Sequence, residues 1–156
     1  SNAGVDDVSC GLTYTLSASP VSGSWTGSPG VIFSNSNSPT STVTVPTLGN
    51  YEFYWEATNA AGCNDFDTVQ VEFTQLALLA ALAEPSCFDA NDGDIMTSVQ
   101  GGTAPYNYQW GVSSNNQVSN QAIDLPSGMH NVTITDANGC TTDSTFILDA
   151  PAPFSF

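Results

Sequence analysis

The chain has 156 residues, of which 40% are hydrophobic, and it carries 15 Asp and Glu but no Lys or Arg, for a formal net charge of −15. Nucleic acids and anionic membranes are held by cationic side chains, so we expect neither partner. The longest apolar run, residues 76–83, is too short to span a bilayer, and we expect no membrane insertion.

Strand-like alternation dominates the first half of the chain. Residues 1–3 resemble the remnant of a cleaved purification tag, so the folded part is expected to follow them. Apolar and polar residues then alternate along 42–45, 51–58 and 69–73, and clusters of Gly, Ser, Asn and Pro separate these runs. Short alternating strands with such turns are typical of a β-sandwich, which we predict for residues 4–75.

The second half begins with an ambiguous segment, Leu-Ala-Leu-Leu-Ala-Ala-Leu-Ala-Glu at 76–84. Its intrinsic propensity favours a helix, but a second sandwich needs its first strand here, so we predict a strand. Farther along, Tyr106, Tyr108 and Trp110 share one face, as core residues would. These patterns predict an all-β protein of two tandem β-sandwich modules, with the second at 76–152.

The four cysteines lie on a regular spacing. Cys10 and Cys63 are 53 positions apart, as are Cys87 and Cys140, and each cysteine of the first pair precedes its counterpart by 77 positions. Cys63 and Cys140 also end similar phrases, Asn-Ala-Ala-Gly-Cys and Asp-Ala-Asn-Gly-Cys. A fixed period of this kind indicates tandem modules.

Small modules are often stapled by disulfides. Only the pairs Cys10–Cys63 and Cys87–Cys140 give each module a bridge of its own, so we predict these two disulfides and an oxidising compartment. Buried free thiols or a zinc site are the alternatives, although zinc sites usually have cysteines two to four residues apart. The same period places residues 153–156 at the beginning of a further module.

Two sets of motifs carry family resemblances. In the second half they are Cys87 to Asp94, Gly101 to Tyr106 with Trp110, Leu125 to Gly128, and Thr135 to Cys140. In this order they resemble the SprB repeat of large surface proteins in gliding and related Bacteroidetes. In the first half they are Cys10 to Leu12, Gly23 to Trp25, the stretch from Phe33, and Gly49 through Trp55 to Cys63.

The first-half motifs are similar to the PKD-like (polycystic-kidney-disease-like) Ig-type domains of the same bacteria. Together, the two resemblances imply Ig-like or PKD-like modules in a secreted, multi-domain surface protein. Such proteins are often adhesins exported by type IX secretion.

Acidic and amide side chains gather after the third cysteine. If Cys87 is bonded to Cys140, oxygen ligands from two segments meet at one end of the second module, namely Asp89, Asn91, Asp92, Asp94, Asp136 and Asn138. Calcium takes six to eight such oxygens, so this group is a candidate Ca²⁺ site, although its spacing is not that of an EF-hand. The alternative is that these residues form turns and cap their own backbone. A weaker candidate, better explained as a solvated acidic rim, comprises Asp6, Asp7, Asp65 and Asp67.

No motif in the sequence singles out a catalytic centre. His130 is the only histidine, and its place on a predicted strand without an adjacent Ser or Cys motif favours a surface strand residue. No pair of carboxylates stands out for sugar hydrolysis. We therefore expect a non-catalytic protein, and sugar binding through exposed aromatic rings would rest almost entirely on Tyr54.

These features favour a structural or adhesive repeat region of a large bacterial cell-surface or secreted adhesin, acting as an acidic stalk without sites for trypsin-like proteases. Its expected partners are neighbouring modules of the same chain and a surface polysaccharide or other adhesion target. The alternative is a carbohydrate-binding accessory region of a secreted enzyme.

Overall fold

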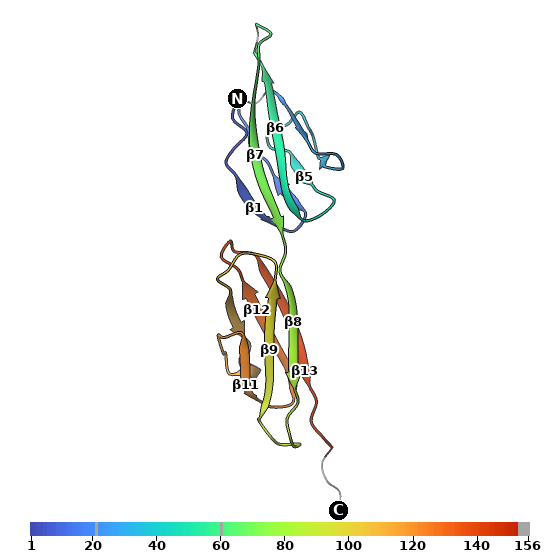
Figure 1. Cartoon of the computed structure of the whole chain (residues 1–156), viewed down its shortest axis with the longest axis vertical. Helices are drawn as coiled ribbons and strands as arrows, with labels where there is room; N and C mark the ends of the chain where they lie inside the picture. The colour runs from blue at the N-terminus through green and yellow to red at the C-terminus, as the bar shows by residue number, and fades with distance from the viewer. Residues whose placement is uncertain (21, 60, 153–156) are drawn as a thin grey trace, which may run out of the picture. The chain divides into compact units, whose positions relative to one another are not determined.

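The computed structural model describes residues 1–20, 22–59 and 61–152, and it divides into two compact units, Ser1–Gln75 and Leu76–Phe156 (Figure 1). The described residues form strands and a single short 3-10 helix, so the all-β prediction is confirmed. No helix in this part of the chain is long and apolar enough to cross a membrane. Residues 153–156, which the period assigned to a further module, lie outside the described residues.

Unit 1 contains two sheets. The larger one has the strand order β1 (Asp7–Cys10), β7 (Asn64–Thr74), β6 (Gly49–Thr58) and β3 (Ser24–Gly27). The smaller one has the order β2 (Thr13–Thr15), β5 (Thr42–Thr44) and β4 (Ile32–Phe33). Strand β1 runs parallel to β7, and every other pair in the unit is antiparallel. The long β6–β7 hairpin forms the two central strands of this larger sheet (Figure 1).

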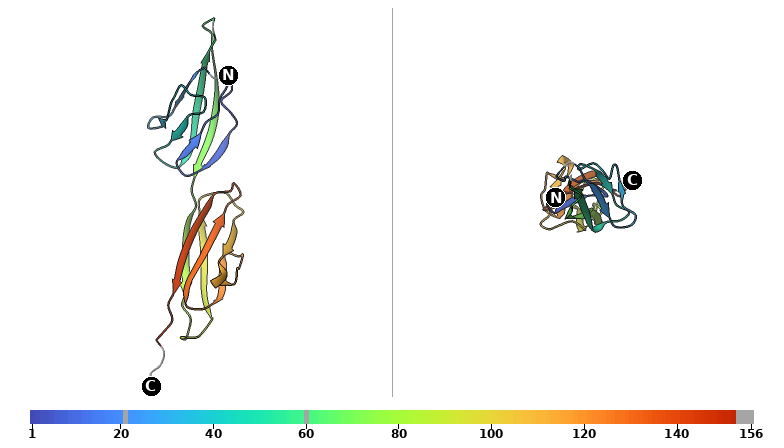
Figure 2. Two further views of the ribbon diagram at one scale, coloured as in Figure 1. Left: turned by 180° about the vertical axis from the view of Figure 1, so that it is seen from behind. Right: turned by 90° about the horizontal axis from the view of Figure 1, so that it is seen from above.

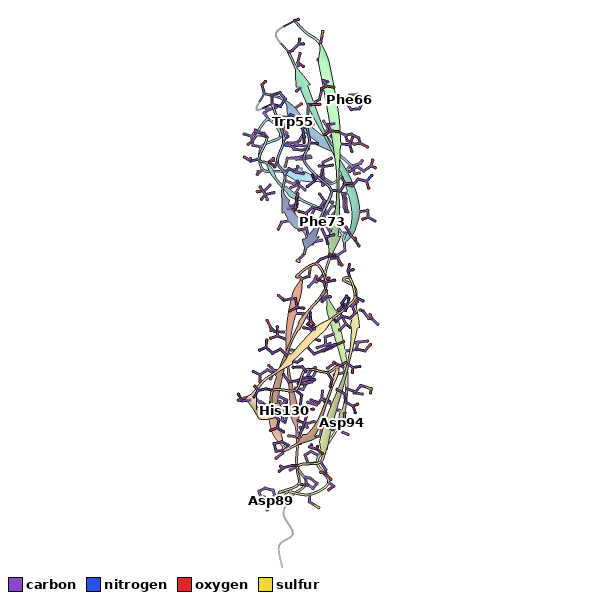
Figure 3. The ribbon with its side chains drawn as sticks, turned by 90° about the vertical axis from the view of Figure 1, so that its left-hand side faces the viewer. Trp55, Phe66, Phe73, Asp89, Asp94 and His130 are labelled. Atoms are coloured by element: carbon purple, nitrogen blue, oxygen red, sulfur yellow. The ribbon has the colours of Figure 1, made fainter. Side chains whose placement is uncertain are left out.

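Alternation along β6 explains how unit 1 builds its core. Phe53 and Trp55 point inward and are fully buried, whereas Tyr54 between them points outward. The smaller sheet contributes Val43 from its central strand to the same cluster. Burying a large apolar side chain contributes about 2 to 3 kcal/mol, so this two-layer packing is the main source of stability. Figure 3 shows Trp55 and Phe73 inside the unit.

Residues 1–3 pack against unit 1. The backbones of Asn2 and Ser19 exchange two hydrogen bonds of 2.8 Å. Ala3 is buried, and its N–H donates to the Asp67 carboxylate at 2.9 Å. Whatever their origin, these residues lie within the folded unit.

Unit 2 also contains two sheets, and all of its strand pairs are antiparallel. One sheet has the order β10 (Asn107–Trp110), β12 (Gly128–Thr135) and β13 (Thr141–Leu148). The other has the order β11 (Gln121–Leu125), β9 (Gly93–Gln100) and β8 (Ala77–Ala83). The 3-10 helix η1 (Val112–Ser114) follows β10. The β12–β13 hairpin, orange to red in Figure 2, corresponds to β6–β7 of unit 1.

The strand predicted for residues 76–84 is confirmed. Strand β8 pairs with β9 over its whole length, and this ladder outweighs the helix propensity of an Ala- and Leu-rich segment. The core behind it unites side chains of both sheets, among them Ile95, Leu125 and Trp110. Tyr106 and Tyr108 pack against this cluster, as their shared face with Trp110 predicted.

The two units share a tryptophan position. Trp25 of β3 lies opposite Trp55 of β6, and Trp110 of β10 lies opposite Val132 of β12, which is 77 positions after Trp55. Each indole N–H donates to a backbone carbonyl in a loop, that of Ser38 at 3.0 Å or that of Ser119 at 2.9 Å. A buried tryptophan with a satisfied N–H therefore anchors the same strand in both units.

Candidate functional site

The turn that carries Cys63 connects β6 to β7 at one end of unit 1. The Oδ1 atom of Asn59 accepts hydrogen bonds from the N–H groups of Ala61 at 2.9 Å and Cys63 at 3.0 Å. Gly62 has φ of 80°, a left-handed conformation that favours glycine. The side chain of Asn59 thus holds the turn, and Cys63 lies exposed at its end.

The turn that carries Cys140 has the same construction in unit 2. The Oδ1 atom of Asp136 accepts hydrogen bonds from the N–H groups of Asn138 at 2.9 Å and Cys140 at 2.8 Å. Gly139 has φ of 85°. In this unit Oδ2 takes a further bond, from the N–H of Thr103 at 2.9 Å.

The carboxyl group of Asp136 is buried, with 3% of the residue exposed. Burial alone opposes ionisation, but the backbone N–H groups of Thr103, Cys140 and Asn138 outweigh it and hold the pKa of Asp136 below its ordinary value of 3.8. Asp136 is therefore a structural carboxylate whose oxygens are occupied by the protein's own backbone.

The other two cysteines lie at the opposite end of each unit. Cys10 ends β1 and lies opposite Thr74, the last residue of β7. Cys87 lies in the loop between β8 and β9, where it lines a shallow pocket of about 580 Å³ together with Pro151. Pro151 follows Thr74 by 77 positions, so each of these cysteines lies beside the end of the last strand of its unit.

The two predicted disulfides are wrong. Cys63 precedes β7 and Cys10 lies opposite its last residue, which puts them about 35 Å apart at the rise of an extended strand. A disulfide requires Cα atoms within about 7 Å. The length of β13 separates Cys140 from Cys87 in the same way. In the structure Cys63 and Cys87 are free and exposed, so neither of the two predicted bridges is formed.

The predicted calcium ligands are not brought together. Asp89 lies at the end of unit 2 near Cys87, whereas Asp94 lies farther along the unit (Figure 3). Asp136 and Asn138 belong to the turn at the opposite end, because the Cys87–Cys140 bond that was expected to join them does not form. Among the residues that the structure describes, no group of three His, Cys, Asp or Glu is arranged to hold a metal ion.

Two of the remaining predicted ligands already have partners. The Asp92 carboxylate accepts the backbone N–H of Ser86 at 2.9 Å, and hydrogen bonds from Ser86 lower the pKa of Asp92. The Asp94 carboxylate accepts the side-chain amide of Gln121. The contact of Asp92 is of the turn-capping kind that was the alternative to metal binding, whereas that of Asp94 is a side-chain bond between β9 and β11.

The carboxylates in the acidic rim of unit 1 also have partners within the protein itself. The terminal amine of Ser1 pairs with Asp65, which lowers the pKa of that carboxyl. Asp6 accepts the N–H of Gln70 at 2.8 Å. Asp7 accepts the hydroxyl of Tyr14, and burial together with this bond raises the pKa of Tyr14 to about 12.

The prediction of a surface position for His130 is wrong. His130 is fully buried on β12, with Nδ1 2.8 Å from the hydroxyl of Ser114 and Nε2 2.9 Å from the carbonyl of Pro126. The carbonyl can only accept, so Nε2 carries a proton. Alternation along β12 contained the signal, because His130 has the same parity as the core residues Val132 and Ile134.

Sequence reasoning missed one exposed aromatic residue beside Tyr54. Phe66 lies on the outer face of β7 with 72% of its surface exposed (Figure 3). In the strand register it is diagonally across from Tyr54 on β6. The Tyr54 hydroxyl donates to Glu52, whose other oxygen accepts the Gln70 amide at 3.1 Å. The outer face of the larger sheet therefore presents two aromatic rings beside hydrogen-bonded carboxylates and amides.

A family model matches the segment that contains Cys87. Residues 80–115 match the SprB repeat. The predicted resemblance is confirmed for this segment, which runs from within β8 to the end of η1 and includes the loop of Asp89 and Asp92. The PKD-like assignment of the first unit is compatible with the Ig-like fold. The SprB repeat implies a cell-surface or secreted protein.

Solved structures resemble the chain in fold. A C-terminal fragment of intimin, solved in complex with the translocated intimin receptor, has 18% identity and a TM-score of 0.59, covering 87% of this chain and 57% of that one. The first eight Ig domains of Down syndrome cell adhesion molecule have 13% identity and a TM-score of 0.60, covering 96% of this chain and 27% of that one. The chain thus spans little more than half of one relative and about a quarter of the other. A search of curated proteins finds no match.

Proposed function

We propose that this chain is a structural and adhesive repeat region of a large bacterial cell-surface or secreted adhesin. The observation that carries the proposal is the match to the SprB repeat within a unit of Ig-like fold. Both structural relatives are described as binding or adhesion proteins, which agrees with an adhesin but does not identify a target. Residues 4–75 and 76–152 are, in this proposal, two tandem Ig-like modules that space or present other parts of the parent protein.

The chemistry of the described side chains supports a non-catalytic role. The single histidine is buried with both ring nitrogens engaged, and the carboxylates of Asp92 and Asp136 are capped by backbone N–H groups. Side chains bonded to nearby backbone groups in this way hold turns in place. A SprB repeat on an Ig-like fold is likewise typically non-catalytic.

Charge supports an extracellular location. A protein with no Lys or Arg offers no cleavage site to trypsin-like proteases, and its net charge of −15 keeps it soluble through self-repulsion. The proposal includes export by a type IX route, as the SprB resemblance implies.

Surface shaving of the source bacterium tests this function. Antibodies against residues 4–152 are expected to label intact cells, and trypsin treatment of those cells is expected to release a large fragment in which this region remains whole. Labelling that requires permeabilised cells would contradict a surface location.

A carbohydrate-binding role is a second candidate, favoured by the exposed pair Tyr54 and Phe66. Sugars stack on aromatic faces, and their hydroxyls donate hydrogen bonds to carboxylates and accept them from amides, groups that Glu52 and Gln70 supply. All three tryptophans are buried, so their fluorescence would not report a bound sugar. Affinity electrophoresis in polysaccharide gels is the better assay.

The assay needs a matched control. If this face binds a polysaccharide, the Tyr54→Ala/Phe66→Ala variant loses retardation, whereas Phe88→Ala, which removes an exposed ring from unit 2, keeps it. Equal migration of all three proteins in every gel leaves the structural role alone.

A further inference from the structure

The outer face of the sheet formed by β10, β12 and β13 is hollowed beside the loop that follows β10. Two adjoining hollows of about 320 and 300 Å³ share Gln109, Asn116 and Thr133 in their lining. Gln109 lies opposite Thr133 in the strand register, and both alternate with core residues, so their side chains point away from the core. We call this region the amide groove, with its floor and wall formed by Asn107, Gln109, Asn131, Thr133, Asn116 and Val118.

The amides of the groove are not used by the protein itself. Among the described residues, no side-chain hydrogen bond within the chain is made by Asn107, Gln109, Asn116 or Asn131. In unit 1, by contrast, the Asn59 side chain holds a turn and the Gln70 amide donates to Glu52. Each free amide offers two N–H donors and a carbonyl acceptor. The groove therefore presents a dense set of donors and acceptors to a ligand.

The wall of the groove is fixed from behind. The Gln117 side chain donates to the carbonyl of Ile123 at 2.8 Å and accepts its N–H at 3.0 Å. The Ser113 hydroxyl donates to the carbonyl of Met129 at 2.8 Å. Asn116 lies between these anchors with φ of 52°, a left-handed conformation that glycine would adopt without strain. Strain of this kind is found where a side chain is needed for function, and the Asn116 side chain lines both hollows.

The charge of the lining selects the class of ligand. The chain carries 15 Asp and Glu, yet none is among the described residues that line the two hollows. Asp143 lies beside the floor, and its carboxylate accepts the hydroxyl of Thr133. A cationic ligand would find its partners elsewhere on the chain, and an anionic one meets a net charge of −15 and no Lys or Arg.

An uncharged sugar matches this lining. Its hydroxyl groups both donate and accept hydrogen bonds, as the amides and Thr133 do. Val118 is 76% exposed on the wall and offers an apolar contact for the C–H face of a sugar ring. A peptide that adds a strand needs an unpaired sheet edge, whereas the groove lies on the face of paired strands.

We propose that the amide groove of unit 2 binds a saccharide built of uncharged sugars through the side chains of Gln109, Asn116 and Asn131. This inference rests on the proposed function, because it gives the adhesive role a class of ligand. It is distinct from the aromatic face of unit 1, since it uses hydrogen bonds to amides instead of stacking on Tyr54 and Phe66.

Nuclear magnetic resonance of the whole ¹⁵N-labelled chain tests the proposal directly, because each side-chain NH₂ group gives its own signals. The probes are neutral hexasaccharides of glucose, galactose, mannose, xylose or N-acetylglucosamine, compared with hexamers of galacturonic acid and of glucosamine. At least one neutral hexasaccharide is expected to shift the NH₂ signals of Gln109, Asn116 and Asn131. Those of Asn50 and Gln70 in unit 1 should stay in place.

Three variants then test the contacts. Gln109→Ala removes one hydrogen-bonding amide and should weaken binding about fivefold. Asn50→Ala, which removes an exposed strand amide from unit 1, is the matched control and should bind like the wild type. Asn116→Gly also should weaken binding about fivefold, but it should unfold at a denaturant concentration no lower than the wild type, because glycine suits the left-handed backbone. A residue with only a structural role would not separate binding from stability in this way.

Several outcomes would overturn the proposal. They are the absence of a shift with every neutral hexasaccharide, shifts with the charged hexamers alone, and wild-type affinity in both Gln109→Ala and Asn116→Gly. Shifts confined to Gln70 would place the sugar on the aromatic face of unit 1 instead. All of these measurements use purified protein, so their failure leaves the surface location untouched. Labelling confined to permeabilised cells would equally leave the binding result unchanged.

Discussion

Phe53 and His130 occupy the same place in the two units, yet their chemistry is opposite. They are 77 positions apart, fully buried, and each lies two residues before the strand position that faces the anchoring tryptophan. Phe53 is surrounded by the rings of Phe33, Tyr51 and Phe73 at centroid distances of 6.1 to 6.4 Å. His130 is held instead by two hydrogen bonds. The same strand arrangement thus accommodates either an apolar or a polar side chain at this core position, provided that the neighbouring residues match its chemistry.

Exchanging the residue of unit 1 tests this comparison most severely. Phe53→His puts an imidazole among aromatic rings with no partner from Ser114 or Pro126, so unit 1 should lose about 4 kcal/mol through lost packing and an unpaired polar group. Hydrogen exchange followed by mass spectrometry resolves the units, and protection should fall in the strands of unit 1, β6 and β7 included, but not in those of unit 2. The matched variant Phe53→Leu should cost about 1.5 kcal/mol. Equal protection in the two variants would contradict the expected penalty.

The reverse exchange should cost less. His130→Phe removes the partner of the buried Ser114 hydroxyl and of the Pro126 carbonyl, and unit 2 should lose about 2 to 3 kcal/mol. Adding Ser114→Ala removes one of the orphaned groups and should restore about 1 kcal/mol. Denaturant titration of both variants measures the difference. A double variant less stable than His130→Phe would show that Ser114 contributes through some other contact.

The turns that carry Cys63 and Cys140 allow a second comparison of the units, with smaller expected effects. Asp136→Ala leaves the N–H groups of Thr103, Asn138 and Cys140, the last of them buried, without their acceptor and should cost about 2 kcal/mol. Asn59→Ala, at an exposed turn where water replaces the lost bonds, should cost about 1 kcal/mol. The same hydrogen-exchange experiment measures both. Equal losses would mean that burial of the Asp136 carboxylate is unimportant.

The sequence predicted local structure well and end-to-end connectivity badly. Alternation located the core strands, including the ambiguous 76–84, because period-two patterning is a local property of the chain. The disulfides could not be found by spacing, because the number of residues between Cys10 and Cys63 says nothing about which end of a long hairpin each one reaches. The proposed calcium ligands depended on that pairing and were separated with it. His130 was predicted at the surface for another reason. Its polar residue type was given more weight than its alternation in step with the core residues of β12.

Acid should change the stability of the two units differently because of Asp136. Its pKa is lowered in the folded protein, so its contribution is complete above the unfolded-state value of about 4 and is lost as the pH falls through the folded pKa. Its counterpart Asn59 does not titrate. Asp136→Asn should therefore flatten the decline of stability below pH 4 in unit 2 and leave unit 1 unchanged. Denaturant midpoints between pH 2.5 and 6 provide the measurement, and an unchanged slope in the variant would contradict this assignment.

Calcium binding remains a prediction. The contacts of the carboxylates in the two units set the size of the effect that calcium should have on thermal stability. The described carboxylates of both units are engaged by N–H or O–H donors or stand apart, so divalent cations should act mainly by screening a charge of −15. Thermal unfolding should then shift by the same small amount in millimolar calcium and in millimolar magnesium, relative to EDTA at fixed ionic strength.

A rise of several degrees specific to calcium would show that the loop of Asp89 and Asp92 binds the ion, and Asp89→Asn would remove it. That outcome would separate the units by ligand binding as well as by core chemistry, because in the described part of unit 1 Cys10 lies on a paired strand and not in such a loop. Cys10 belongs to β1 and pairs with β7, whereas Cys87 is displaced into a loop that β8 and β9 leave unpaired. The loop is not paired with a strand, and it carries exposed acidic and aromatic side chains. Comparing thermal unfolding in Ca²⁺ and in Mg²⁺ tests whether these side chains also bind an ion.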